Sequence, residues 1–189
     1  METYNNFVDW YKSSLSDAMD KINHLELWSI ASIIENTTNS NGKVYLIGNG
    51  GSAAIAAHFC HNLCWDVSAD RPIGKKVKAI MLNEQMSHLT GLANDRHYDD
   101  IFKIQLENLL NKNDMVIGIS ASGNSANIIE AIKYTKETNV QYVTITGQGG
   151  GELKKLGGDN INVISNDQQV TEDIQSSICH IVVRMLYYK

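Results

Sequence analysis

The sequence contains no apolar stretch long enough to cross a membrane, and its first residues lack the basic and apolar regions of a signal peptide. Cysteine is also rare, and the three that occur are an odd number placed in apolar helical segments: Cys60, Cys64 and Cys179. Such cysteines are typical of reduced thiols in a cytoplasm. These features predict a cytoplasmic protein with no membrane partner.

Positive charge is scarce as well. The formal net charge is −5, which argues against general nucleic-acid binding. A phosphate-bearing ligand must therefore be held by local hydrogen-bond donors and not by a global field. The chain has a single proline, Pro72, and no low-complexity run, so its 189 residues with 43% hydrophobic content predict one domain over residues 1–189.

A glycine-rich turn between a strand and a helix is the feature around which the chain is arranged. The β-branched run Val44–Ile47 is followed by the sequence GNGGS at 48–52 and then by an alanine-rich segment. Glycine lets the backbone approach a ligand, and a helix start presents free N–H groups and the positive end of the helix dipole. Such a turn can bind phosphate. The candidate donors are Asn49, Gly50, Gly51 and Ser52.

An ordinary strand–helix turn with a cap is the alternative for this segment. The sequence GNGGS is neither the dinucleotide pattern GxGxxG nor a Walker loop, so we expect no nucleotide cofactor. A second turn of the same kind favours phosphate. The run Met115–Ile119 ends in SASGNS at 120–125, just before the helical segment Asn127–Thr138. Helix capping explains one of the three hydroxyls, Ser120, Ser122 and Ser125, but not all of them.

Apolar periodicity predicts the other elements. Further strands are expected at Val77–Met81, Tyr142–Thr146 and Ile161–Ile164. Helices are expected at Phe7–Ile22, Leu25–Glu35, Ser87–Ala93, Asp99–Asn111, Glu152–Leu156 and Gln169–Tyr188.

Strands that alternate with helices at this spacing form βαβ units. They predict an α/β fold: a three-layer sandwich with a doubly wound parallel sheet of about five strands. The two helices within residues 1–40 have no strand of their own and are expected to pack on the domain and in an oligomer. Both glycine turns follow the carboxyl ends of strands, where ligands bind in such folds, so one pocket can contain both.

These motifs resemble a known family. The sequence GNGGS with the alanine-rich segment that ends at His58, the pattern NDxxY at Asn94–Tyr98, and GISASGNSAN at Gly118–Asn127 resemble the sugar isomerase (SIS) family. Within that family the chain is most similar to the phosphoheptose isomerases. The resemblance implies the SIS fold, a homotetramer, and conversion of sedoheptulose 7-phosphate to a heptose 7-phosphate for surface polysaccharide. Asp95, inside NDxxY, is a candidate substrate-binding residue.

An aldose–ketose isomerase needs a base near C1 and C2 and a group that stabilises the developing oxyanion. The candidates are His58, His61, Asp95, Glu172 and His180. The resemblance makes His58 and His180 metal ligands and gives His180 a catalytic role as well. It places Glu172 where the family has a metal-binding glutamine, and Asn62 where it has a glutamate that binds zinc and transfers protons. We therefore expect a zinc ion on His58, Glu172 and His180, with Glu172 and His180 as the catalytic residues.

Two other functions remain open. Asn62 does not ionise, which favours a non-catalytic SIS protein that binds a phosphosugar as a sensor or assembly partner. An isomerase for another sugar phosphate is also compatible, because selectivity for chain length depends on pocket shape. The sequence HFCHNLC at 58–64 suggests a separate zinc site, but its histidines and cysteines spread over too wide an arc of one helix to converge.

Overall fold

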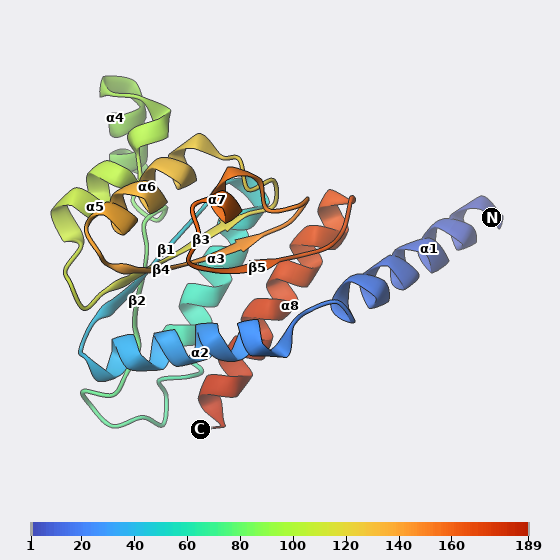
Figure 1. Cartoon of the computed structure of the whole chain (residues 1–189), viewed down its shortest axis with the longest axis horizontal. Helices are drawn as coiled ribbons and strands as arrows, with labels where there is room; N and C mark the ends of the chain where they lie inside the picture. Colours follow the sequence, from blue (N-terminus) through green and yellow to red (C-terminus); the bar gives the residue numbers. More distant parts are fainter. Residues whose placement is uncertain (1, 189) are drawn as a thin grey trace.

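Five parallel strands form one sheet in the computed structural model, which describes residues 2–188 (Figure 1). The strands are β1 (Lys43–Gly48), β2 (Lys78–Met81), β3 (Met115–Ser120), β4 (Gln141–Thr146) and β5 (Asp159–Asn162). Their order across the sheet is β2-β1-β3-β4-β5. The chain therefore builds outward from β1 in one direction and from β3 in the other. The switch point between these two strands is where doubly wound folds bind ligands.

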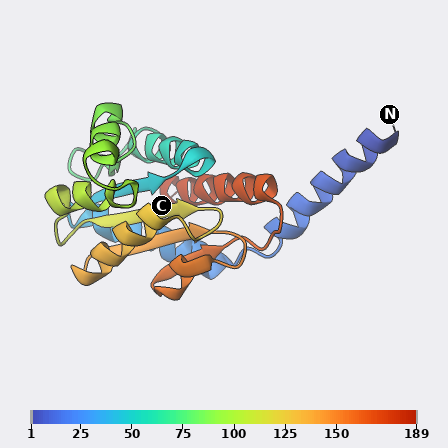
Figure 2. The same ribbon diagram turned by 90° about the horizontal axis from the view of Figure 1, so that it is seen from above.

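Helices cover both faces of the sheet, which confirms the expected three-layer α/β sandwich (Figure 2). The helices are α1 (Glu2–Met19), α2 (His24–Asn39), α3 (Gly50–Cys64), α4 (Met86–Asp95), the short 3-10 helix η1 (Tyr98–Asp100), α5 (Lys103–Leu109), α6 (Ala126–Glu137), α7 (Gly151–Lys155) and α8 (Gln168–Tyr187). None of the helices within residues 2–188 has the length and apolarity needed to cross a membrane.

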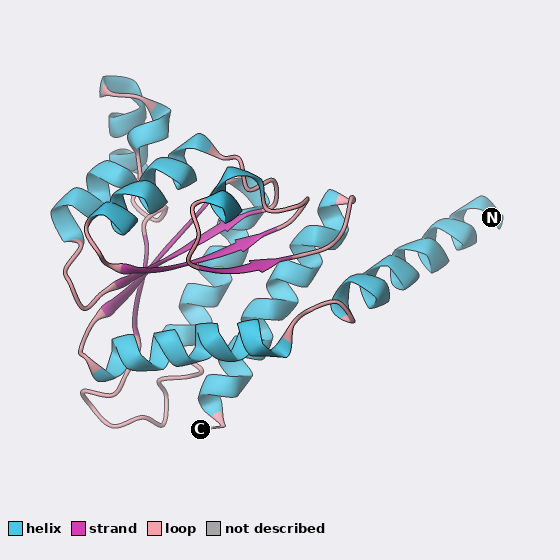
Figure 3. Ribbon diagram, in the orientation of Figure 1, coloured by secondary structure: helices cyan, strands magenta, loops and turns pink. Residues whose placement is uncertain are grey.

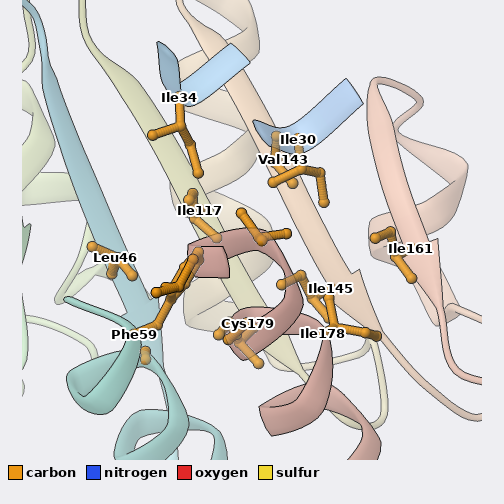
Figure 4. Close-up of a cluster of buried hydrophobic side chains, with 14 of the residues drawn as sticks. Ile30, Ile34, Leu46, Phe59, Ile117, Val143, Ile145, Ile161, Ile178 and Cys179 are labelled. Carbon is orange, nitrogen blue, oxygen red and sulfur yellow. The ribbon is translucent and has the colours of Figure 1, made fainter. Parts of the chain in front are cut away.

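Alternate residues of each strand enter two separate cores. In β1, Val44 and Leu46 pack with α2, α3 and α8, whereas Tyr45 and Ile47 pack with α5 and α6. A strand that is buried on both faces reads as a continuous apolar run, which is why the sequence marked β1 and β3 so clearly. Figure 4 shows the first core, in which Leu46 of the sheet lies near Phe59 of α3 and Ile145 lies near Ile178 of α8.

Helix α1 projects from the body and contacts it through its second half (Figure 3). The Tyr11 hydroxyl donates a 2.7 Å hydrogen bond to the Asp173 carboxylate of α8, and Leu15 and Met19 pack against the core. The first half of α1 carries exposed aromatic side chains, with Tyr4 79% and Phe7 64% exposed. Exposed apolar side chains on a projecting helix are typical of a surface that another chain covers.

Four predicted elements differ from the structure. Helix α1 runs from Glu2 to Met19 in place of the expected Phe7–Ile22, and α2 continues to Asn39, past the expected end at Glu35. The expected helix Asp99–Asn111 is divided into η1 and α5, because the turn between them buries the adjacent side chains Ile101 and Phe102 together in the second core. The last strand begins and ends two residues earlier than the expected range Ile161–Ile164. Its asparagines explain the difference, because the side chain of Asn160 hydrogen-bonds to Thr144 and Thr146 of the neighbouring strand.

Candidate functional site

The two glycine turns line one pocket at the carboxyl edge of the sheet, with a volume of about 360 Å³. Because β1 and β3 are neighbours, the turns that follow them lie side by side. The pocket is lined by the expected residues Asn49, Gly50, Gly51, Ser52, Ser120, Ser122 and Ser125, and also by Ile119, Ala121, Gln148, Gln168 and Glu172. The shared pocket that the sequence predicted is therefore present.

The second turn is held in shape by its own hydroxyls and by the turn after β4. Ser120 Oγ lies 3.0 Å from Ser125 Oγ and accepts a hydrogen bond from the Gly123 amide at 3.2 Å. Gly123 has φ +66°, and a side chain there would collide with the backbone of Gly150. Ser122 Oγ accepts from the Asn124 amide at 3.1 Å, which leaves its own hydrogen available to a ligand.

The N-cap residues of the helices that start at these turns make no side-chain capping hydrogen bond, although the Ile128 amide in the first turn of α6 donates to Asn127 Oδ1. Within the described chain, Asn49 makes no capping hydrogen bond to α3, and Ser125 makes none to α6. In contrast, Asn23 caps α2 and Asp167 caps α8 through side-chain oxygens. Uncapped helix N-termini combine orphan N–H donors with the positive end of the helix dipole. Two such helix starts at one pocket favour the binding of an anion there.

Glu172 places a carboxylate in this same pocket. Its Oε1 accepts a hydrogen bond from Gln168 at 3.2 Å, and a side chain at Gly51 would run into the carboxylate. Glycine at position 51 therefore allows Glu172 to lie against the first turn of α3. The helix dipole stabilises a negative charge there, but the same charge repels a second anion.

His58 and His180 meet in a second hollow. Their ring centroids are 5.0 Å apart and the rings are nearly perpendicular, at 79°. The hollow has a volume of about 690 Å³, and Asn62 also lines it. Both histidines are exposed in the single chain, whereas Asn62 is buried. Helices α3 and α8 lie side by side in the same direction, so this hollow lies further along both helices than the contact between Gly51 and Glu172.

The histidine pair suits two ligands of one metal ion, because tetrahedral zinc with Zn–N of about 2.0–2.1 Å places two imidazole centroids roughly 5 Å apart. Zinc sites need three or four protein ligands. Within residues 2–188, no group of three or more histidine, cysteine, aspartate or glutamate side chains could hold a metal ion. The expected set of His58, Glu172 and His180 is not assembled, because Glu172 lies about 12 Å of helix rise from His180 and its carboxylate lies at Gly51. The residues present do not form a complete zinc site.

Asp95 lies outside the pocket of the glycine turns. It is exposed at the end of α4, where its carboxylate accepts a 2.8 Å hydrogen bond from the neighbouring Asn94. Another residue of the NDxxY pattern does reach the turns: the Tyr98 hydroxyl donates to Asn49 Oδ1 at 3.1 Å. Sequence reasoning also missed Asn127, which is 2% exposed and bonds to Asn49. Tyr98 is the last residue of NDxxY, and Asn127 is the last residue of GISASGNSAN. Their place in these motifs was the sequence signal that could have identified them.

The three cysteines form no disulfide within the described residues and line neither hollow. Cys60 and Cys179 are buried, and Cys64 is exposed at the end of α3. The contact with the Cys60 thiol lowers the pKa of Cys64 to about 6, whereas burial raises the pKa of Cys179.

Fold and site together define a doubly wound α/β protein with a pocket at the switch point of its sheet, between the N-termini of α3 and α6. The chain belongs to the SIS domain family, whose model matches residues 6–147. That match ends before α8, the helix that carries Glu172 and His180.

Relatives are similar over nearly the whole length. The chain is 36% identical over 165 residues to a probable phosphoheptose isomerase of Thermoplasma acidophilum, which covers 87% of this chain and 89% of the relative. It is 34% identical over 172 residues to a phosphoheptose isomerase of Helicobacter pylori, covering 91% and 88%. The solved phosphoheptose isomerase of Neisseria gonorrhoeae superposes with a TM-score of 0.88 at 27% identity, covering 100% of this chain and 98% of that one.

Proposed function

We propose that the protein is a sugar-phosphate aldose–ketose isomerase that converts sedoheptulose 7-phosphate to a heptose 7-phosphate. The observation that carries the proposal is the pair of uncapped helix N-termini at one pocket. The similarity to phosphoheptose isomerases over most of the chain supports the reaction type. The phosphate would lie against the first turns of α3 and α6, with hydroxyls such as Ser122 as further donors.

The spacing of the two hollows supports a long sugar. His58 follows Gly51 by seven residues of α3, or about 10 Å of helix rise. An extended chain advances roughly 1.2 Å per bond, so C1 of a seven-carbon sugar lies about 10 Å from a phosphate on its far end. A five-carbon sugar phosphate spans about 2–3 Å less than a seven-carbon one. The histidine hollow therefore suits the reacting end of a heptulose.

The chemistry required is a proton transfer between adjacent carbons. A base takes a proton from C1 of the ketose while the C2 carbonyl oxygen gains one, which gives an enediol. Return of a proton to C2 with loss of the O1 proton gives the aldose. His180 would act as base and acid at the histidine hollow, and His58 beside it would stabilise charge on the oxygens. Glu172 would share this work only if C1 and C2 lie between its carboxylate and His180, which are separated by about 12 Å of helix rise. The two histidines and Glu172 can each gain or lose a proton. The buried Asn62 amide cannot, and it only donates and accepts hydrogen bonds.

Several finer features belong to the same proposal. The exposed histidines and the exposed aromatics of α1 support a homo-oligomer, with a tetramer as the expected form, in which a neighbouring subunit closes the histidine hollow. The free cysteines support the proposal of a cytoplasmic location. Zinc, where it binds, would use His58 and His180, and its remaining ligands would come from groups that the described residues do not assemble.

The test is an assay of purified protein with sedoheptulose 7-phosphate, with and without added zinc, in which aldose formation is followed by NMR. Fructose 6-phosphate and ribulose 5-phosphate serve as shorter substrates. We expect turnover to be fastest on the seven-carbon substrate. Equal or faster turnover on a shorter sugar would assign the protein to another sugar phosphate.

The second candidate function is a phosphosugar-binding protein without turnover. Two observations favour it: Asn62 does not ionise, and the metal-ligand set is incomplete. In that case sedoheptulose 7-phosphate binds in a calorimeter, but none of the sugars is converted at any zinc concentration.

A further inference from the structure

The side-chain amides of Asn49 and Asn127 form a reciprocal pair that joins the two glycine turns. Asn49 Nδ2 donates to Asn127 Oδ1 at 2.7 Å, and Asn127 Nδ2 donates to Asn49 Oδ1 at 3.0 Å. Asn49 lines the pocket, whereas Asn127 is buried behind it in the first turn of α6. The pair therefore links the start of α3 to the start of α6.

A backbone group fixes the orientation of this pair. The Ile128 amide donates to Asn127 Oδ1 at 3.0 Å. A backbone N–H only donates, so the atom that it meets on Asn127 must be the oxygen and not the nitrogen. The two ends of an asparagine amide are otherwise told apart by their hydrogen-bond network, and here the network has one solution. Asn127 Nδ2 faces Asn49, which must present its oxygen to it.

Tyr98 adds a third contact to the same oxygen. Its hydroxyl donates to Asn49 Oδ1 at 3.1 Å, so both lone pairs of that oxygen are engaged by Asn127 and Tyr98. Asn49 Nδ2 has two hydrogens, of which one is used by Asn127. The second N–H of Asn49 Nδ2 therefore remains available to donate a hydrogen bond to a molecule in the pocket.

We propose that Asn127 is a positioning residue, which holds Asn49 in the one orientation that presents an N–H donor, and not a carbonyl oxygen, to a phosphate in the pocket. The proposal rests on the proposed function in so far as the ligand is a sugar phosphate. A reversed Asn49 amide would direct a partial negative charge at the anion. Asn127 therefore acts on the phosphate through Asn49, without touching it.

A merely local role for Asn127 is the competing explanation. Its bond to the Ile128 amide lies within the start of α6, and its loss could weaken the helix and the pocket together. The two explanations differ in whether Asn49 is needed. If Asn127 acts through Asn49, its replacement has no further effect on phosphate binding once the Asn49 side chain is absent.

The experiment is a double-mutant cycle with inorganic phosphate as the probe, measured by calorimetry on the full chain. Asn127→Leu removes both hydrogen bonds between Asn127 and Asn49. Asn127→Ser keeps a hydroxyl that can accept from the amides at the start of α6, but its side chain is too short to reach Asn49. We expect each to weaken phosphate binding about tenfold, and to weaken it less than twofold in the Asn49→Ala background. Equal losses in both backgrounds, unchanged affinity in the single variants, or no phosphate binding by the wild type would each overturn the proposal.

Two further measurements distinguish a specific effect of Asn127 on phosphate binding from a general weakening of α6 and from the isomerase proposal. Thr135→Val is the matched control, because it removes a buried side-chain hydrogen bond of α6 to Ala131, far from the pocket, and should leave phosphate affinity unchanged. In the isomerase assay the Asn127 variants should raise KM for sedoheptulose 7-phosphate about tenfold while kcat stays within about threefold. A wild type that binds phosphate but converts no sugar would end the isomerase proposal, and the phosphate cycle would still decide the role of Asn127.

Discussion

The imidazole rings of His58 and His180 meet edge to face, with their centroids 5.0 Å apart, although the two residues come from the first and last helices that flank the sheet after β1 and β5. The contact exists because α3 and α8 lie side by side and run in the same direction. It places two imidazole side chains in one exposed hollow, next to the buried amide of Asn62. Asp66 and Asp70 also line the hollow, but within the described residues no three histidine, cysteine, aspartate or glutamate side chains are grouped so that they could hold a metal ion.

The histidine pair predicts weak zinc binding that improves when a carboxylate is added. Asn62→Glu places a third potential ligand in the same hollow, so we expect zinc affinity to rise about tenfold or more. His58→Ala and His180→Ala should abolish zinc binding. Calorimetry and metal analysis of the purified variants measure both effects. Zinc that survives both histidine replacements would place the metal elsewhere.

Ser122 is predicted to donate to the phosphate. Its oxygen already accepts from the Asn124 amide, so its hydrogen is available, and a hydrogen bond to a charged group contributes about 1.5–3 kcal/mol. Ser122→Ala should therefore weaken phosphate binding tenfold or more in a calorimetric titration. Ser177→Ala on α8 is the control, because its hydroxyl bonds to the Asp173 carbonyl outside this pocket. Unchanged affinity for Ser122→Ala would exclude it as a donor.

The cysteines are predicted to differ strongly in reactivity. Cys64 is exposed and the contact with Cys60 lowers its pKa to about 6, so its thiolate is largely formed at pH 7. Burial raises the pKa of Cys179, which keeps that thiol protonated and shielded. With iodoacetamide we expect modification of Cys64 first, at a rate that climbs through pH 6 and is nearly constant above pH 7. A rate that still rises from pH 8 to pH 9, measured by mass spectrometry, would show an ordinary thiol pKa.

The sheet and the pocket could be predicted because their signals are local. Apolar runs such as Met115–Ile119 mark strands that are buried on both faces, and the glycines that follow mark the turns. Two turns at the carboxyl ends of parallel strands must then share an edge. The order of the strands across the sheet, β2-β1-β3-β4-β5, was not predicted from the sequence.

The rest depends on contacts between distant segments. The pairing of Asn49 with Asn127 follows from the register of β1 against β3, which no local pattern reveals. The break between η1 and α5 is set by packing of Ile101 and Phe102 in the second core, and this overrides the helical period. The position of Glu172 depends on how α8 lies along α3. This packing places its carboxylate in the pocket of the glycine turns and not in the histidine hollow.

The carboxylate of Glu172 gives the most discriminating prediction. Glu172→Gln keeps the size and the hydrogen bond to Gln168 but removes the charge beside Gly51. Loss of a group that transfers protons should lower kcat by roughly 10²–10⁴. Removal of a negative charge from the phosphate pocket should leave phosphate affinity unchanged or raise it, because like charges repel. Steady-state kinetics with sedoheptulose 7-phosphate and calorimetry with phosphate measure the two effects separately.

The matched variant restores a carboxylate in the other hollow. Asn62→Glu alone gives the protein a carboxylate at both positions, whereas Asn62→Glu combined with Glu172→Gln returns one carboxylate to the histidines. We expect the double variant to recover most of the turnover that Glu172→Gln loses, because a base beside His180 no longer has to act from the pocket of the glycine turns. If Glu172→Gln keeps full turnover while His180→Ala abolishes it, catalysis runs through the histidines alone. Glu172 would then be a resident anion at the start of α3, and its removal would be seen only as tighter phosphate binding.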